Sequence, residues 1–193
     1  MPDVLTAVGA ALGRRRAARR WRRLESGSAA LILAYHRVAD LPADPNGLAV
    51  HPERFAGHLE LLRRNYRPLP LRTLIRDLAE NRLPERAVVI TFDDGYEDNL
   101  TQARPLLARH DVPATVFVVS GQVGAGREFW WDELEQIVLR AGELPRDLGL
   151  ELDGGSFRFS FDGDARWTEA DLERHRDWNL RSRHDPTARH RLF

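Results

Sequence analysis

Residues 88–99 read VVITFDDGYEDN, and this stretch decides what kind of fold the chain can adopt. An apolar run rich in β-branched residues, Ala87 to Phe92, leads directly into Asp93 and Asp94. Such a run predicts a strand that is buried on both faces, as in a parallel sheet. In parallel α/β folds, side chains at the carboxyl end of a strand line the ligand site. The stretch therefore predicts a buried strand that ends in a functional carboxylate pair.

Two adjacent carboxylates repel each other, so this strand end needs a chemical explanation. Gly95 permits a sharp turn, which lets Asp93 and Asp94 lean toward one pocket. A shared proton or a cation would relieve the repulsion. With a divalent cation, one aspartate ligates the metal while the other acts as a base toward bound water. The alternative is that Asp93 and Asp94 only cap a helix or form a turn, which Asp-Asp-Gly favours. Separately, Asp98 or Asn99 is a candidate cap for the next helix.

Two other apolar runs, Leu31 to Tyr35 and Ala114 to Val119, predict further strands, with helical patterns between all three. This alternation predicts an α/β fold with a parallel sheet. About three strands are too few for a closed barrel, which needs about eight. His36 follows the first run, so we expect it near the same rim of the sheet as Asp93. Lining the pocket and packing at the strand end remain alternatives for this histidine.

After Gly121 the sequence no longer follows the alternation of apolar runs and helical patterns described above. Trp130 and Trp131 open a helical pattern, and we interpret them as core residues, with stacking on sugar rings as the alternative. Residues 150–161 alternate between apolar and polar on both sides of an Asp-Gly-Gly-Ser turn, which predicts a β-hairpin.

Composition narrows the class of protein. The 193 residues have a formal net charge of zero, which argues against a general nucleic-acid binder. They contain no cysteine, so any metal must be held by carboxylate, imidazole or water. No transmembrane segment and no clear signal peptide are recognisable, so a cytoplasmic location is the default expectation. The arginine cluster from Arg14 to Arg23 predicts a solvated arm, with weak contact to an anionic membrane surface as the alternative.

The segment Thr91-Phe92-Asp93-Asp94-Gly95-Tyr96 resembles the first motif of the polysaccharide deacetylases, the NodB-homology or carbohydrate esterase 4 family. Leu33 to Val38 resembles the first strand of that family, and Pro113 to Val118 resembles the strand after the motif helix. The likeness covers roughly residues 30 to 121. The segment from Phe129 onward resembles an insertion found in one branch of the family.

The resemblance implies an α/β fold that is a partial deformed (β/α) barrel of the NodB-homology type, with an inserted helix and β-hairpin segment. It divides the chain into three parts. Residues 1–28 would form a basic N-terminal arm, residues 29–121 the N-terminal part of the deacetylase barrel, and residues 122–193 the inserted segment.

The resemblance also implies a hydrolase that removes N-acetyl groups from a polysaccharide or amino-sugar glycan. Asp93 would be the general base and Asp94 a ligand of a divalent metal, often zinc, while His36 is a candidate for substrate binding. The metal would polarise the amide carbonyl and lower the pKa of the attacking water. Members of the family commonly act on glycans of the cell envelope.

The second motif of the family, His-Ser/Thr-x-x-His, supplies two metal histidines and does not occur in this sequence. His110, His175, His184 and His190 have other spacings, and we interpret each as a solvated surface imidazole. One aspartate cannot hold a catalytic zinc, which takes three protein ligands. The chain is therefore expected to be the truncated N-terminal part of a longer deacetylase.

Two other functions remain as alternatives. A non-catalytic remnant or carbohydrate-binding fragment of such an enzyme would also lack the histidines. A phosphate-transferring enzyme that uses magnesium is disfavoured, because Asp93 and Asp94 are adjacent and no phosphate-binding glycine loop follows them.

Overall fold

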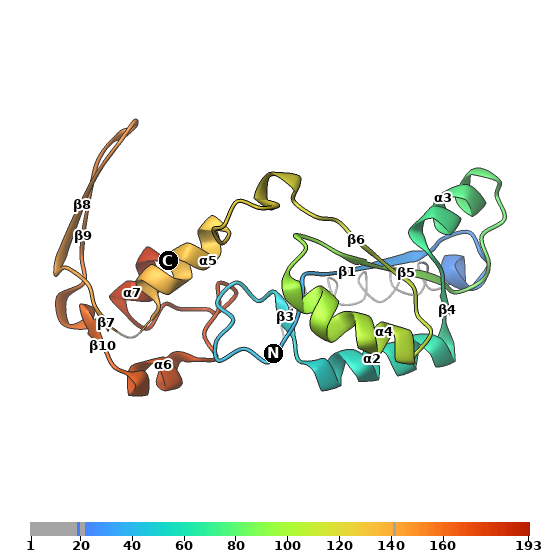
Figure 1. The fold of residues 1–193 in the computed structure, drawn as a ribbon, viewed down its shortest axis with the longest axis horizontal. Helices are drawn as coiled ribbons and strands as arrows, with labels where there is room; N and C mark the ends of the chain where they lie inside the picture. Colours follow the sequence, from blue (N-terminus) through green and yellow to red (C-terminus); the bar gives the residue numbers. More distant parts are fainter. Residues whose placement is uncertain (1–18, 20–21, 141) are drawn as a thin grey trace, which may run out of the picture. The chain divides into compact units, whose positions relative to one another are not determined.

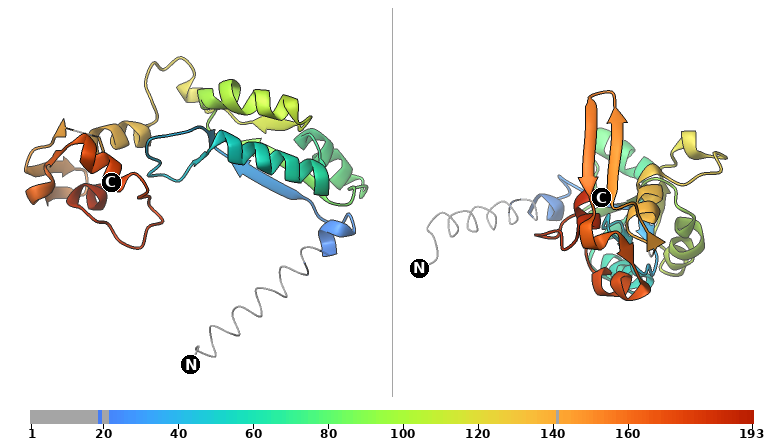
Figure 2. Two further views of the ribbon diagram at one scale, coloured as in Figure 1. Left: turned by 90° about the horizontal axis from the view of Figure 1, so that it is seen from below. Right: turned by 90° about the vertical axis from the view of Figure 1, so that its left-hand side faces the viewer.

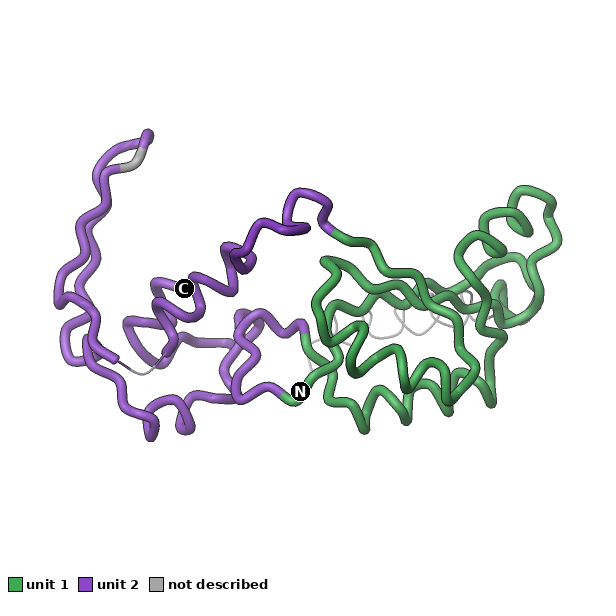
Figure 3. Tube along the Cα trace, viewed as in Figure 1, with its two compact units in different colours: residues 1–40, 49–118 green, residues 41–48, 119–193 purple. Residues whose placement is uncertain are grey.

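The computed structural model describes residues 19, 22–140 and 142–193, which form two compact units (Figure 3). The first unit contains the described residues up to Asp40 together with Ala49–Val118, and the second contains Leu41–Leu48 and Val119–Phe193. Most of the predicted basic arm, and with it most of the arginine cluster considered for membrane contact, lies outside the described residues.

The first unit is built on a parallel sheet with β5 at its centre. Its strands are β1 (Leu31–Tyr35), β4 (Arg67–Pro68), β5 (Ala87–Phe92) and β6 (Ala114–Val116). β1 pairs with β5 along its whole length, so that Tyr35 lies opposite Phe92, while β4 and β6 share the other edge of β5. Every residue of β5 is buried, as its apolar sequence predicts. The predicted α/β fold with a parallel sheet is confirmed, and the described strands form an open sheet.

Two helices cover one face of this sheet (Figure 1). They are α2 (Pro52–Asn65) and α4 (Arg104–Arg109), and a π-helical turn, η1 (Asn99–Ala103), leads into α4. The N–H of Arg104 donates to the carbonyl of Asn99, five residues back, which is the hydrogen bond of a π-turn, and Pro105 follows with no N–H to donate. A further helix, α3 (Leu71–Ala79), follows β4, and a short parallel pair is formed by β2 (Arg37–Val38) and β3 (Ala49–Val50).

The core of the first unit lies between the sheet and these helices. It contains Val38, Phe55, Leu59, Leu62, Val88, Ile90, Phe92, Ala103 and Val112. Three aromatic rings pack together within it, with the Phe92 ring 5.6 Å from Tyr35 and 5.8 Å from Phe55. This packing fixes the position of the residue before Asp93, and so the direction in which β5 delivers the carboxylate pair.

The second unit consists of short elements around its own small core. In chain order they are η2 (Ser120–Gln122), α5 (Trp130–Val138), β7 (Gly142–Glu143), β8 (Asp147–Leu152), β9 (Gly155–Ser160), η3 (Asp162–Asp164), β10 (Arg166–Trp167), α6 (Glu169–His175) and α7 (Ala188–Leu192). β8 and β9 form the predicted antiparallel hairpin, which extends from its unit as a two-stranded ribbon (Figures 1 and 2). None of the described helices is both long and apolar enough to cross a membrane.

A buried arginine holds the second unit together. Arg189 is 1% exposed, and its guanidinium donates hydrogen bonds to five backbone carbonyls. The acceptors are the carbonyls of Val138, Arg140, Gly142, Asp164 and Ala165, at distances of 2.6 to 3.2 Å. Burial lowers the pKa of Arg189, while the Asp164 carboxylate acts in the opposite direction.

Two expectations about aromatic side chains in this unit are wrong. His190 is 4% exposed and packs against Trp167 and Trp178, so it is a core residue and not a surface imidazole. Trp130 is 64% exposed and so is not a core residue. In both cases helical periodicity gave no indication of which face of a short helix the neighbouring loops would cover.

We expect the buried His190 to make the second unit less stable in acid. Desolvation, helped by the nearby His175, lowers the pKa of His190 to about 4. The unfolded chain takes up this proton near pH 6.5. Protonation therefore favours unfolding as the pH falls from about 7 to 4, by at most about 3 kcal/mol. Urea unfolding followed by tryptophan fluorescence at pH 7.5 and 4.5 measures this loss.

The matched variants are His190→Gln and His184→Gln, because His184 is exposed. The first should reduce the difference in stability between the two pH values, and the second should leave it unchanged. An equal dependence on pH in wild type and His190→Gln would contradict the assignment.

Candidate active site

The turn after β5 needs the residues that the sequence places there. Asp94 and Gly95 both have positive φ, at 72° and 80°. Aspartate tolerates this left-handed conformation better than most residues. A Cβ atom on Gly95 would lie 3.1 Å from Cγ2 of Val118 and 3.3 Å from its Cα, so the close approach of the next segment also demands glycine. The turn places the Asp94 side chain beyond the strand end.

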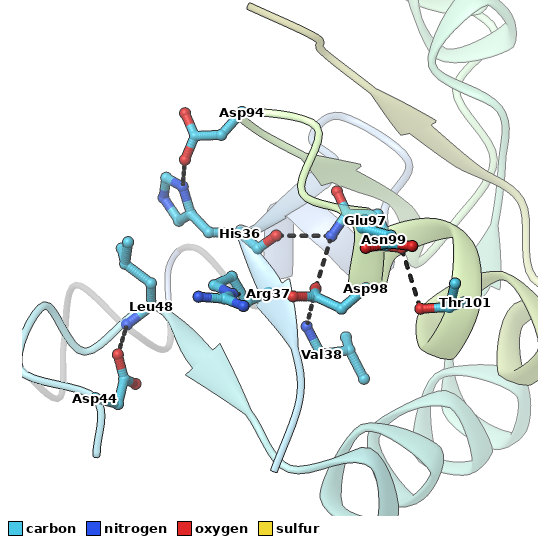
Figure 4. Close-up of polar contacts among 10 residues, drawn as sticks. All are labelled: His36, Arg37, Val38, Asp44, Leu48, Asp94, Glu97, Asp98, Asn99 and Thr101. Carbon is cyan, nitrogen blue, oxygen red and sulfur yellow. Dashed lines mark hydrogen bonds and ion pairs between the residues drawn. The ribbon is translucent and has the colours of Figure 1, made fainter. Parts of the chain in front are cut away.

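The Asp94 carboxylate meets His36 from the neighbouring strand end (Figure 4). Nδ1 of His36 lies 2.8 Å from Oδ2 of Asp94. An ionised carboxylate can only accept, so the imidazole donates through Nδ1–H. The Asp94 side chain is 17% exposed and that of His36 is 36% exposed, so part of the imidazole is open to solvent. The expected position of His36, on the same rim as the aspartates, is what the parallel pairing of β1 and β5 produces.

Asp93 is half-buried and lies directly after Phe92. Its backbone N–H donates to the carbonyl of Tyr35 at 2.9 Å, which extends the pairing of β1 and β5 by one step. The backbone of Asp93 therefore still follows the sheet, while that of Asp94 has left it. The two adjacent carboxylates belong to different backbone environments, which suits two different chemical roles.

The next two polar residues do not do what the sequence predicts. Neither Asp98 nor Asn99 makes a side-chain hydrogen bond that caps the following helical turn. Both side chains instead reach back to the chain around His36 (Figure 4). Oδ1 of Asp98 accepts from the N–H of Val38 at 2.9 Å, and Nδ2 of Asn99 donates to the carbonyl of His36 at 2.8 Å. The capping interpretation is therefore wrong.

Arg37 completes this arrangement. Its Nε donates to Oδ2 of Asp98 at 2.9 Å, and its guanidinium lies 4.4 Å from the centre of the Tyr96 ring. Asp98 is 9% exposed, so its charge is balanced by a cation and a backbone donor at close range. Sequence analysis did not single out Arg37 or these contacts. The partners are about sixty residues apart along the chain, beyond the reach of any local pattern.

The described residues do not by themselves complete a metal centre. No group of three or more His, Cys, Asp or Glu side chains in residues 22–140 and 142–193 is arranged to hold a metal ion. Asp94 and His36 lie together, and a catalytic zinc takes three protein ligands. The residues present therefore do not fit the metal that the resemblance implies.

Comparison with known proteins shows which family the residues around this site resemble. Residues 80–143 match the family described as polysaccharide deacetylase, and this range includes Asp93 and Asp94. The YxkH protein of Bacillus subtilis is 29% identical over 119 residues, which cover 61% of this chain and 41% of that protein. A poly-beta-1,6-N-acetyl-D-glucosamine N-deacetylase of Escherichia coli is 34% identical over 87 residues, 44% of this chain and 13% of that enzyme. The chain thus spans less than half the length of each of these relatives.

Two solved structures resemble parts of this chain. IcaB from Ammonifex degensii is 30% identical, with 57% of this chain and 48% of that chain covered and a TM-score of 0.46. The Streptococcus pyogenes deacetylase PplD is 25% identical, with 56% and 50% covered and a TM-score of 0.42. The family match and the curated relatives confirm the resemblance to the polysaccharide deacetylases that the Asp-Asp-Gly strand end indicates, and the matched residues 80–143 include Asp93 and Asp94.

Proposed function

We propose that this chain is part of a metal-dependent hydrolase that removes N-acetyl groups from an amino-sugar polysaccharide. The observation that carries the proposal is the contact between Asp94 and His36 at the carboxyl end of a fully buried strand. Poly-β-1,6-N-acetylglucosamine is the first substrate to test, because the Escherichia coli and Staphylococcus aureus relatives are named for it.

In this proposal Asp93 is the general base. Hydrolysis of an N-acetyl group requires water to lose a proton as it attacks the amide carbon, and a carboxylate at a strand end can accept that proton. Asp93 lies at the carboxyl end of β5, at the rim where ligands of parallel α/β folds bind. The Asp94 carboxylate, held on one oxygen by His36, keeps its other oxygen for a cation.

The divalent metal, zinc by the resemblance, needs ligands beyond those that the described residues bring together. We therefore propose that the complete site includes residues that do not belong to these 193, supplied by a longer form of the polypeptide or by a second chain. Apolar side chains exposed along β1 and β6 support this incomplete state. Ile32 is 56% exposed and Phe117, just after β6, is 51% exposed, and further elements packed on the faces of a completed parallel sheet would cover such side chains.

The competing function is a non-catalytic carbohydrate-binding fragment. It is favoured by one observation, the lack of a three-ligand metal cluster among the described residues. It differs from the main proposal in a measurable way, because it predicts binding of the glycan without release of acetate under any metal condition.

The decisive experiment measures acetate release from N-acetylglucosamine oligomers with and without added ZnCl₂. It uses the 193-residue chain and a form extended through any His-Ser/Thr-x-x-His encoded downstream. We expect activity in the extended form only. There, Asp93→Asn should lower kcat about 10²- to 10⁴-fold with little change in KM, because a general base acts on the chemical step.

The control is Asp111→Asn, since the Asp111 side chain is 90% exposed and distant in sequence from the strand end. It should keep full activity. Tight one-to-one zinc binding with acetate release by the 193-residue chain would contradict the incomplete state. Glycan binding without acetate release by the extended form would favour the binding fragment instead.

A further inference from the structure

Residues 35–38 form the corner between β1 and β2, and the segment that follows β5 makes three hydrogen bonds to it, in addition to the pairing of β2 with β3. The carbonyl of Tyr35 accepts from the N–H of Asp93, the carbonyl of His36 accepts from Asn99, and the N–H of Val38 donates to Asp98. His36 itself belongs to neither strand. Its backbone therefore depends on side chains from one loop for its position, and its imidazole meets Asp94 from that same loop.

The Asn99 amide has a defined orientation. Nδ2 donates to the carbonyl of His36 at 2.8 Å and to Oδ1 of Asp98 at 3.2 Å, so both amide hydrogens are used. A flipped amide would place its oxygen against two acceptors, which excludes that alternative. The correct orientation leaves Oδ1 of Asn99 buried without a hydrogen-bond partner among the described atoms. An unpaired buried acceptor costs stability, which offsets part of what the two hydrogen bonds of Asn99 contribute.

Asp98 acts on the other side of the corner. One of its oxygens takes the N–H of Val38 and the other takes Nε of Arg37, both at 2.9 Å. Asp98 and Asn99 therefore hold the chain at two points. Asn99 donates to the carbonyl of His36, and Asp98 accepts from the N–H of Val38, two residues later. Rotation of the corner would have to break both bonds. In the described contacts, Asp94 is the hydrogen-bonding partner of the His36 side chain. The position of the imidazole therefore depends on this contact and on the backbone of the corner.

We propose that Asp98 and Asn99 are positioning residues that fix the His36 imidazole against Asp94. The inference rests on the proposed function only in taking Asp94 as part of the reaction site. Its chemical consequence is a single neutral tautomer of His36, with the proton on Nδ1 facing the carboxylate and a lone pair on Nε2. A fixed lone pair on Nε2 can accept a hydrogen bond from a substrate hydroxyl or amide, or bind a cation.

The tautomer can be measured in the 193-residue chain by long-range ¹H–¹⁵N NMR of the histidine rings near pH 8, with His36→Gln to assign the signals. In the wild type we expect a protonated Nδ1 and an unprotonated Nε2. In Asn99→Ala, both ring-nitrogen signals should shift toward the averaged positions of a free imidazole. In Asp98→Asn, the amide oxygen can still accept from the N–H of Val38, but the amide NH₂ would face the Nε–H donor of Arg37. This variant should cause a smaller shift in the same direction.

The matched control is Thr101→Val, which removes the hydrogen bond to the carbonyl of Glu97 in the same turn without touching the corner. Its His36 signals should match the wild type. A wild-type spectrum with the proton on Nε2 would overturn the proposal even if no variant folds. Unchanged His36 signals in folded Asn99→Ala and Asp98→Asn, or an equal shift in Thr101→Val, would overturn it as well. The measurement needs neither activity nor metal, so its failure is distinct from failure of the proposed hydrolysis.

Discussion

Replacing Arg189 with methionine is expected to lower the free energy of unfolding of the second unit by about 3 to 5 kcal/mol. Methionine fills most of the same volume, but it cannot donate to the carbonyls that the guanidinium now joins. Each buried hydrogen bond of this kind contributes about 1 kcal/mol, and each unpaired carbonyl adds a penalty. Because whole domains are stable by only about 5 to 15 kcal/mol, the second unit should be largely unfolded at moderate urea concentrations.

Urea unfolding monitored by tryptophan fluorescence measures this effect, because every described tryptophan belongs to the second unit. Arg191→Met is the control, since Arg191 is exposed two residues further along the same helix. It should change the midpoint little. Arg189→Lys should lower the urea midpoint nearly as much as Arg189→Met. The lysine ammonium group cannot donate to five carbonyls at once, as the planar guanidinium does. A midpoint for Arg189→Met within experimental error of wild type would show that the contacts are dispensable.

The second large effect is expected for Phe92→Ala in the first unit. Phe92 is fully buried between Tyr35 and Phe55, and its removal leaves a cavity at the carboxyl end of the central strand. Substitutions of this kind cost about 3 to 5 kcal/mol. Thermal unfolding followed by far-ultraviolet circular dichroism should show a correspondingly lower midpoint for the first unit.

Leu61→Ala is the matched control, because Leu61 lies on α2 but is 53% exposed. The two substitutions remove large apolar side chains from the same unit and differ in burial. A similar midpoint for the two variants would mean that the aromatic packing around Phe92 does not support the strand end that carries Asp93.

Local sequence patterns predicted the elements well where one residue type dominates. The β-branched run from Ala87 to Phe92 is the central buried strand, and the alternation around Asp153 is the hairpin. The predicted strand from Ala114 to Val119 ends early, at Val116. Apolar sequence alone cannot tell where pairing stops, because that depends on the length of the neighbouring strand: Phe117 makes the last backbone bond, to the carbonyl of Phe92.

Predictions failed where a side chain has a distant partner. Asp98 looks like a helix cap because its near neighbours favour that use, yet its oxygens bind residues about sixty positions away. His190 is expected at the surface because its spacing from the other histidines does not suit a metal site, yet it packs among rings from two other segments. In both cases a tertiary contact outweighs the local preference, since burial and a charge-assisted hydrogen bond are stronger than a capping or solvation preference.

The sequence by itself determined the α/β class, the buried strand that ends in Asp93 and Asp94, and the resemblance to polysaccharide deacetylases, because each rests on local patterns and on their order along the chain. The tertiary structure decided which groups surround that pair. His36 faces Asp94, and Asp98 and Asn99 hold the corner that carries it. The physical reason is the parallel pairing of β1 with β5, which sets Tyr35 opposite Phe92 and so brings two strand ends that are 57 residues apart to one rim.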